Sequence, residues 1–329
     1  MPVRKTESRL PANHLATDLG QSAASVDGRC TLISFVTNPL VIDRENTYVL
    51  FVTDAGLAAS IQSFEWSFEE SGGAPNIQTT QAGEIIYRPQ SVGTLNLTVR
   101  AMNVGNAEQA SVSLSQDIVV TSAELEALIT NASDQPGAGV GNPDAARELV
   151  NDHNPYYQSV ELQTPESGDG FKRFVFSMVY EGAIQRDPIQ RREHLAQVAA
   201  ALNDFSTDIV SLAGQGVGVS SIRLALLAMS LGNSPPLQWT ELPEVSSNHA
   251  LADEQLRSNL AALDENTRID LFNLARFPKS NIIWCGRILE GLRNRYFPGV
   301  NFDDVLTGMS GIRMQRIVRH YRDGPLART

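Results

Sequence analysis

Two sets of side chains could do chemistry: isolated glutamates and a run of arginines near the C-terminus. Glu181 and Glu290 are the candidates for the acid of a glycan hydrolase, an enzyme that needs cleft carboxylates and an apolar setting that raises the pKa of one of them. Glu181 stands between Tyr180 and Gly182, at an expected helix end. For each glutamate we favour the interpretation as a solvated surface charge over that as a catalytic acid.

The arginines recur at a regular spacing. Four of them occupy every third position and drift slowly around one side of a helix; we call them the basic ridge: Arg313, Arg316, Arg319 and Arg322. Residues 268–329 hold 11 basic and 5 acidic side chains, whereas the whole chain carries a formal charge of −11. Such a ridge can dock an acidic protein surface or a phosphate backbone. Alternatively, these arginines favour the negative end of their helix and are neutralised by the acidic remainder of the chain.

Several features argue against nucleic acid as the partner. The net charge of −11 opposes coating of a polyanion by the whole protein. No set of aromatic stacking residues interleaves with the arginines of the basic ridge, and no base-recognition motif is present. We therefore expect a protein partner with an acidic surface.

The sequence predicts neither a metal site nor a cofactor. Metal ligands cluster in sequence motifs, but no Cys-x-x-Cys or His-Glu-x-x-His occurs and the histidines are dispersed. The glycine-rich residues 214–221 precede a helix, as in a dinucleotide site, but the third glycine falls one residue early for G-x-G-x-x-G. We expect this segment to be a flexible connection between helices, with glycines that permit positive φ.

The cysteines offer no nucleophile. Cys30 and Cys285 lie in different expected domains without a disulfide pattern, so two free thiols are expected. Cys285 stands mid-helix among apolar residues, where a buried and inert thiol is typical. The Gly-x-Ser-x-Gly elbow of serine hydrolases is also missing from the sequence.

The first third of the chain shows the alternation of strands with one buried face. Aromatic and polar residues alternate over residues 64–68, and Leu95, Leu97 and Val99 share one face of residues 93–101. Turn-forming residues separate these segments. The pattern predicts a small antiparallel β-sandwich with strands at residues 31–36, 47–52, 61–68, 84–88, 94–102 and 110–120.

Residues 64–107 resemble a PKD module, a family of immunoglobulin-like sandwiches. Such modules carry a Trp-x-Phe strand, a later Tyr before a turn, a Gly-Thr followed by Leu-x-Val, and an Asn-x-Gly turn. These places are filled by Trp66, Phe68, Tyr87, Gly93, Thr94, Leu97, Val99, Asn103 and Gly105. The usual Gly-Asp-Gly after the Trp strand is replaced by residues 69–73. The resemblance spans residues 31–121 and implies an immunoglobulin-like fold of a non-catalytic kind.

From residue 171 the spacing of apolar residues becomes helical. Helices are expected at residues 189–212, 220–231, 253–263, 266–275, 280–296 and 302–321. In the last of these, apolar residues would anchor the basic ridge to a helical bundle: Val305, Leu306, Met309, Ile312, Ile317 and Val318. A helix starting at Ser122 and a Gly- and Pro-rich linker over residues 133–143 are expected between the two halves.

The expected fold class is therefore α+β with two domains. A flexible arm (residues 1–30) precedes a PKD-like or immunoglobulin-like sandwich (31–121), a short helix with linker (122–170) and an all-α domain (171–329). No apolar stretch is long enough to span a membrane. Residues before Cys30 lack the apolar core of a signal peptide. We therefore expect a cytoplasmic protein, or one exported without a cleaved leader as part of an assembly.

Two functional hypotheses follow. In the first, the chain is a non-enzymatic binding or structural component of a larger assembly, and contacts its partners through sandwich edges and the basic ridge. A part or cargo of a phage-tail-like contractile injection apparatus is compatible with the missing leader. In the second, the chain is an effector or toxin enzyme such as a peptidoglycan hydrolase, with the sandwich as a targeting module and Glu181 or Glu290 as catalytic residues.

Overall fold

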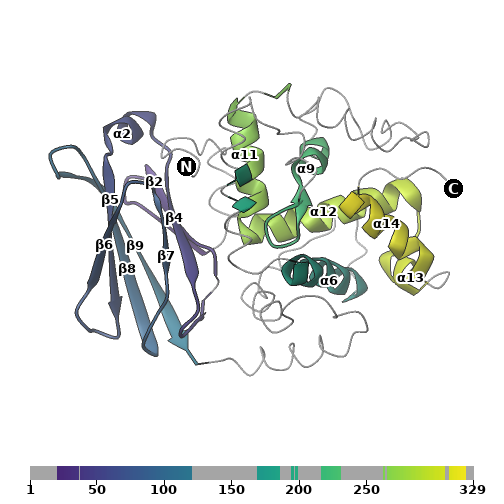
Figure 1. Ribbon diagram of the computed structural model, residues 1–329, viewed down its shortest axis with the longest axis horizontal. Helices are drawn as coiled ribbons and strands as arrows, with labels where there is room; N and C mark the ends of the chain where they lie inside the picture. The colour runs from purple at the N-terminus through teal and green to yellow at the C-terminus, as the bar shows by residue number, and fades with distance from the viewer. Residues whose placement is uncertain are drawn as a thin grey trace. The chain divides into compact units, whose positions relative to one another are not determined.

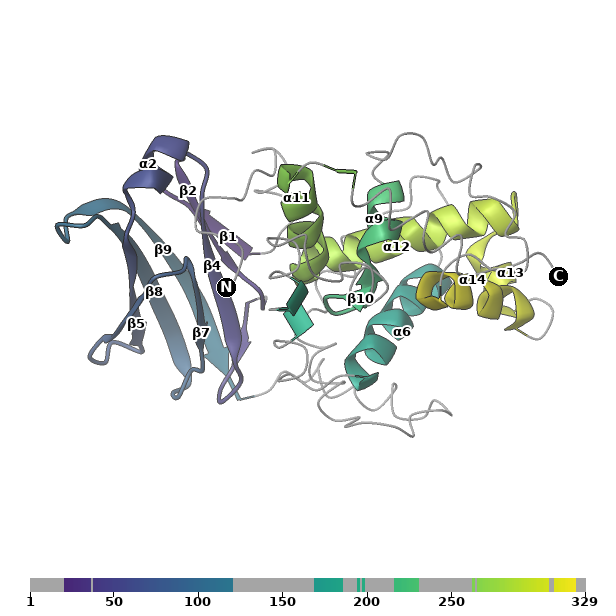
Figure 2. The same cartoon turned by 45° about the horizontal axis from the view of Figure 1, so that its top comes forward.

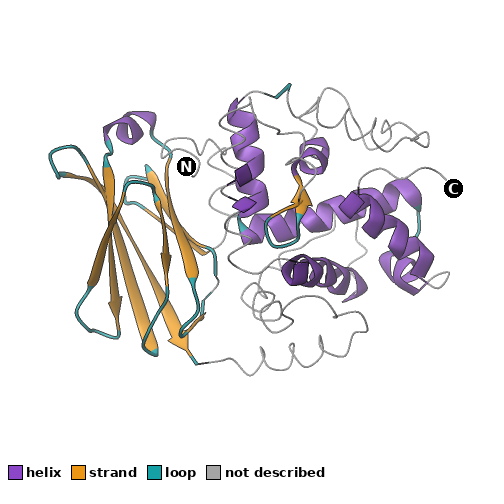
Figure 3. Ribbon diagram, viewed as in Figure 1, coloured by secondary structure: helices purple, strands orange, loops and turns teal. Residues whose placement is uncertain are grey.

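The chain combines β-sheets and helices, so the expected α+β class is correct at that level (Figures 1 and 3). The structure is a computed structural model, and it describes residues 21–36, 38–120, 169–185, 194–195, 197–198, 216–230, 262–263, 265–307 and 311–323. The chain divides into two compact units. We call the described residues 21–120 the β unit and the described residues 169–323 the helical unit.

The β unit consists of two sheets. Its elements are β1 (Gln21–Ala24), β2 (Cys30–Ser34), β3 (Leu40–Val41), β4 (Asn46–Val52), α2 (Ala55–Ser60), β5 (Ser63–Glu70), β6 (Asn76–Thr80), β7 (Glu84–Tyr87), β8 (Gly93–Met102) and β9 (Glu108–Val119). One sheet has four strands in the order β1-β2-β4-β7, and the other has five in the order β3-β9-β8-β5-β6 (Figure 2). The β3–β9 pair is parallel and the other strand pairs described are antiparallel.

Buried residues of both sheets form one hydrophobic core. Strand β5 contributes Phe64, Trp66 and Phe68, which alternate with exposed or half-buried residues as the sequence predicts. Trp66 stands opposite Val99 of β8. From the other sheet, Tyr87 stacks on Phe68 with ring centroids 3.8 Å apart. Because successive side chains of a strand point to opposite faces, every aromatic residue of β5 lies on the core side.

A chain of buried polar groups crosses this core. The Tyr48 hydroxyl of β4 donates a hydrogen bond to Oε1 of Gln116 in β9 at 2.8 Å. Nε2 of Gln116 donates to the Ser34 hydroxyl at 3.2 Å, and Nδ2 of Asn46 donates to the same oxygen at 2.8 Å. Because an unpaired buried polar group is costly, these contacts favour one alignment of the two sheets.

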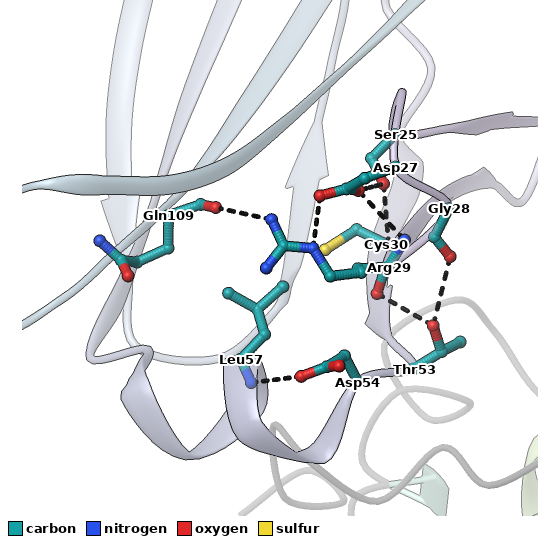
Figure 4. A network of polar contacts seen from close by, with 9 residues as sticks. All are labelled: Ser25, Asp27, Gly28, Arg29, Cys30, Thr53, Asp54, Leu57 and Gln109. Atoms are coloured by element: carbon teal, nitrogen blue, oxygen red, sulfur yellow. Dashed lines mark hydrogen bonds and ion pairs between the residues drawn. The ribbon is translucent and has the colours of Figure 1, made fainter.

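The β unit begins earlier than expected. The sequence places residues 1–30 in a flexible arm, but β1 pairs antiparallel with β2. The turn between them is held by Asp27, which accepts hydrogen bonds from the Ser25 hydroxyl at 2.6 Å and from the backbone and guanidinium of Arg29 (Figure 4). These bonds, with Ser25 first, lower the pKa of Asp27 to about 2. Arg29 also donates to the Gln109 carbonyl at 3.5 Å.

The helical unit is not purely helical. Its elements are α6 (Asp169–Gln185), β10 (Gly216–Val217), β11 (Ile222–Arg223), α9 (Leu224–Ser230), α11 (Glu265–Arg276), α12 (Pro278–Tyr296), α13 (Phe302–Thr307) and α14 (Ile312–Asp323). The helices predicted at residues 266–275 and 280–296 are confirmed as α11 and α12. Proline occupies the first turn of α12, where its missing N–H leaves no partner unbonded.

Two predictions for this unit are wrong. The glycine-rich residues 214–221 do not simply connect helices, because β10 lies within them and pairs with β11, just after them, as an antiparallel hairpin, and α9 begins only after β11. The single helix predicted at residues 302–321 is two helices, α13 and α14, with Gly311 in the left-handed region at φ 79° just before α14. Consequently Ile312, expected to face the bundle, is exposed.

Some expectations fall outside the described residues. These are the helix starting at Ser122, the linker at residues 133–143 and most of the helices predicted at 189–212 and 253–263. Among the described helices, none has the length and apolar character that a membrane span requires.

Trp66 gives a direct test of the shared core. Its side chain is fully buried, and its Nε1 donates to the Thr80 hydroxyl at 2.8 Å. We expect Trp66→Ala to lower the free energy of unfolding by about 3–5 kcal/mol, measured by urea denaturation followed by circular dichroism. Trp66→Phe should cost less, since it keeps much of the ring volume. Val104→Ala, at a position 82% exposed, should be nearly neutral. Equal losses in Trp66→Ala and Val104→Ala would contradict this core.

Candidate functional site

The basic ridge lies on α14, as its spacing predicts. Arg319 and Arg322 are exposed, whereas Arg313 and Arg316 are half-buried. The two glutamates lie elsewhere: Glu181 is in α6, with a side chain outside the described part, and Glu290 is in α12. Glu290 is only 4% exposed, so its interpretation as a solvated surface charge is wrong.

Aromatic rings from the end of α12 lie against the half-buried arginines. The guanidinium carbon of Arg316 is 4.6 Å from the centre of the Tyr296 ring, and that of Arg313 is 5.6 Å from the Phe297 ring. The guanidinium carbon of Arg295 is 5.8 Å from the Tyr296 ring. We call these five residues the arginine–aromatic cluster. The sequence-based expectation that aromatic residues do not interleave with these arginines is therefore wrong in three dimensions.

The end of α12 explains how these rings meet α14. Phe297 leaves helical geometry at φ −139° and ψ 61°, while its N–H still donates to the Arg293 carbonyl at 2.7 Å. The buried Arg293 guanidinium donates to the Val300 carbonyl at 2.9 Å and lies 5.2 Å from the Phe302 ring. Arg293 thereby fixes the turn that leads from α12 into α13.

The buried His320 of α14 orients Tyr296. Its Nδ1 lies 2.5 Å from the Tyr296 hydroxyl, and the two rings meet edge to face with centroids 5.5 Å apart. Burial, together with the positive charges of Arg295, Arg223 and Arg316, lowers the pKa of His320 to about 3. The imidazole is therefore neutral at physiological pH and adds no charge to the cluster.

This arrangement is suited to binding an anion. Arg313, Arg316 and Arg319 form no hydrogen bond or ion pair within the described part of the chain. Stacking uses the flat face of a guanidinium and leaves its N–H edge available for a carboxylate or phosphate. A bidentate contact of this kind is charge-assisted and directional. The cluster can therefore hold an anionic group at a defined position.

Other kinds of chemistry find little support in the described residues. They contain no group of three or more His, Cys, Asp or Glu side chains that could hold a metal ion. Cys30 and Cys285 are both free and buried, as predicted for Cys285. Burial raises the pKa of each thiol to about 11, so neither is a ready nucleophile.

Sequence reasoning found the ridge arginines but missed Arg295, Tyr296, Phe297 and His320. A local signal existed, because residues 293–297 alternate arginine with polar and aromatic residues at a helix end. The contact of residues 295–297 with α14 depends on the turns between α12 and α14, which carry no periodic pattern. The pairing of the two segments could therefore not be predicted.

His320 generates a pH prediction. Its folded pKa of about 3 lies below the ordinary histidine pKa of 6.5, so protons bind preferentially to the unfolded chain. The stability that depends on neutral His320 is complete above pH 6.5 and declines as the pH falls toward 3. Between pH 7.5 and 4.5, we expect the free energy of unfolding to fall less steeply in His320→Gln than in the wild type. The two slopes should differ by at most about 1.4 kcal/mol per pH unit, the contribution of one proton. Parallel pH profiles in urea denaturation would contradict the neutral, buried state.

Comparison of the chain with protein-family models, with curated proteins and with solved structures finds no match in any of the three. The geometry of the arginine–aromatic cluster is therefore the basis for the function of the protein proposed below.

Proposed function

We propose that this chain is a non-enzymatic binding component of a larger protein assembly and docks an acidic partner protein on the arginine–aromatic cluster, extended by Arg319 and Arg322. The β unit would serve it as an immunoglobulin-like sandwich of the PKD kind. Buried and more exposed residues alternate along β5 and β8, and the core is built around Trp66. Both features support the assignment of the β unit to this kind of sandwich.

One observation carries the docking proposal: the guanidinium groups of Arg313 and Arg316 lie near aromatic rings and form no ion pair within the described part of the chain. Two arginines of the β unit do have acidic partners, since Arg100 pairs with Glu65 at 3.0 Å and Arg88 with Glu45 at 3.4 Å. Arg313 and Arg316 are instead positioned by Phe297 and Tyr296. Ordered side chains lose less freedom on binding, so this surface is partly preorganised for a partner. Arginine and tyrosine are also the residues that most often dominate binding energy at protein interfaces.

The geometry favours an acidic protein over a nucleic acid. Tyr296 has the guanidinium groups of Arg295 and Arg316 near its ring and the edge of His320 against it. Those contacts compete with the stacking of a base, which single-stranded nucleic acid sites usually require. A carboxylate needs only the N–H edge of a guanidinium, and Arg316 forms no hydrogen bond or ion pair within the described residues.

The hydrolase hypothesis gains no support from the described residues. Glu290, one of its two candidates, is 4% exposed and therefore out of reach of a polymeric substrate. Glu181 contributes no side-chain geometry, because that side chain lies outside the described part.

The test uses two anionic probes of matched length and charge: a fluorescent polyglutamate peptide of about 15 residues and a single-stranded oligonucleotide. We expect the intact protein to bind polyglutamate more tightly in fluorescence anisotropy, with affinity that falls as salt rises. Arg316→Glu/Arg319→Glu should weaken that binding by about tenfold or more, because two attractive charges become repulsive. Arg316→Lys should lose part of the affinity, since lysine keeps the charge but not the planar fork.

The matched control is Arg88→Glu/Arg100→Glu, which makes the same change of net charge on the β unit. It should bind polyglutamate within about twofold of the wild type, because neither arginine belongs to the proposed surface. The fold should be kept, since exposed ion pairs contribute little to stability. Circular dichroism checks that all variants are folded. Equal binding by wild type and Arg316→Glu/Arg319→Glu would refute the proposed surface. Tighter binding of the oligonucleotide, lost in the same variant, would make the partner a nucleic acid.

A further inference from the structure

Within the described part of the chain, strand β6 forms one edge of the five-stranded sheet. Strand β6 is the last strand of that sheet and pairs on one side with β5, from Asn76 opposite Phe68 to Thr80 opposite Phe64. No further backbone hydrogen bond to β6 exists within the described part of the chain. The outward N–H and C=O groups of such an edge can pair with another strand.

β6 carries no charged side chain, no proline within the strand and no bulge, three features that commonly prevent edge pairing. Edge strands are usually blunted by charged side chains, by proline within the strand or by a bulge. Residues 71–83, which contain β6 and both flanking turns, include no charged side chain, and the β5–β6 register is unbroken. Ile77, the second residue of β6, is 58% exposed. By contrast β7, at the edge of the other sheet, begins with Glu84 and is followed by Arg88.

We propose that β6 pairs antiparallel with β6 of a second copy of this chain, so that two five-stranded sheets join into one. The occupant follows from the charge pattern. A two-fold axis sets each residue against its own strand, so that like charges would face each other in a charged edge, whereas an uncharged edge pairs with itself without repulsion. An acidic or basic partner would find no complementary charge along residues 71–83.

If all five residues of β6 pair with the second copy, the register follows, because the two-fold axis passes through the central residue. Gln78 stands opposite Gln78 of the second copy, Ile77 opposite Thr79 and Asn76 opposite Thr80. Ile77 and Thr79 share one face of β6, so each isoleucine covers the β-branched threonine of the other copy. Thr80 is already fixed, because its hydroxyl accepts from Trp66 in the core. Five residues per strand are a short contact, so we expect a reversible dimer with a Kd on the order of 10 μM.

Sedimentation equilibrium of the full chain between about 1 and 200 μM tests the dimer. We expect a monomer–dimer equilibrium in the wild type and a shift toward monomer of at least about tenfold in Ile77→Lys/Thr79→Lys, which places four like charges around the two-fold axis. Ile86→Lys is the matched control on β7, where Ile86 is 38% exposed, and should dimerise as the wild type does. A wild type that stays monomeric, or a double variant that still dimerises, would overturn the proposal.

Cross-linking tests the register. Gln78→Cys should form a disulfide-linked dimer under mild oxidation, because the two residues face each other across the axis. The native thiols do not compete, since Cys30 and Cys285 are buried. Ser67→Cys, on the outer face of the neighbouring strand β5, should remain monomeric on a non-reducing gel. A cross-link in Ser67→Cys instead of Gln78→Cys would place the contact elsewhere. Arg316→Glu/Arg319→Glu should dimerise normally, which separates this proposal from the docking of an acidic partner.

Discussion

The buried carboxamide of Asn281 is the contact on which the helical unit depends. Its oxygen accepts hydrogen bonds from the backbone N–H and the hydroxyl of Ser220 at 2.8 and 2.6 Å, and its nitrogen donates to the carbonyls of Val217 and Ala275 at 3.0 and 2.6 Å. Gly218 is required beside it, because a Cβ there would lie 2.0 Å from the Ala275 carbonyl oxygen and 2.4 Å from the Asn281 nitrogen. One side chain therefore joins the β10–β11 hairpin, the end of α11 and the start of α12.

This contact extends to the arginine–aromatic cluster through α14. The buried Tyr321 hydroxyl donates to the Ser220 carbonyl at 3.0 Å, so the hairpin holds α14 as well. The adjacent His320 contacts Tyr296 at the far end of α12. Two neighbouring residues of α14 thus bind the hairpin and α12, and this sets the helix so that Arg316 lies over the Tyr296 ring. The proposed docking surface is a consequence of buried hydrogen bonds, which position Arg316, a side chain that forms no ion pair with the described residues.

Regular patterns explain what could be predicted from the sequence. Strands β5 and β8 alternate over eight and ten residues, and α11 and α12 show helical spacing, so all four were predicted close to their true bounds. β1 and β6 are short and mostly polar, and the hairpin has no period, so these elements were missed. The bonds of Ser220 to Asn281 and Tyr321 span 61 and 101 residues. No local pattern reports contacts at such separation, which is why the ridge arginines were found without their aromatic neighbours.

Hydrogen–deuterium exchange of the full chain in the Asn281→Leu variant tests this account most directly. The substitution leaves buried partners in the hairpin and in α11 without a hydrogen bond, at a cost of about 1–3 kcal/mol each. We predict faster exchange in residues 216–223 and in α14, with the β unit unchanged as an internal reference. Ser280→Ala is the matched control, since among the described residues the buried Ser280 hydroxyl bonds to the nearby carbonyls of Leu274 and Phe277 and not to the hairpin. Exchange in α14 that stays at the wild-type rate in Asn281→Leu, or that rises equally in Ser280→Ala, would contradict the central role of Asn281.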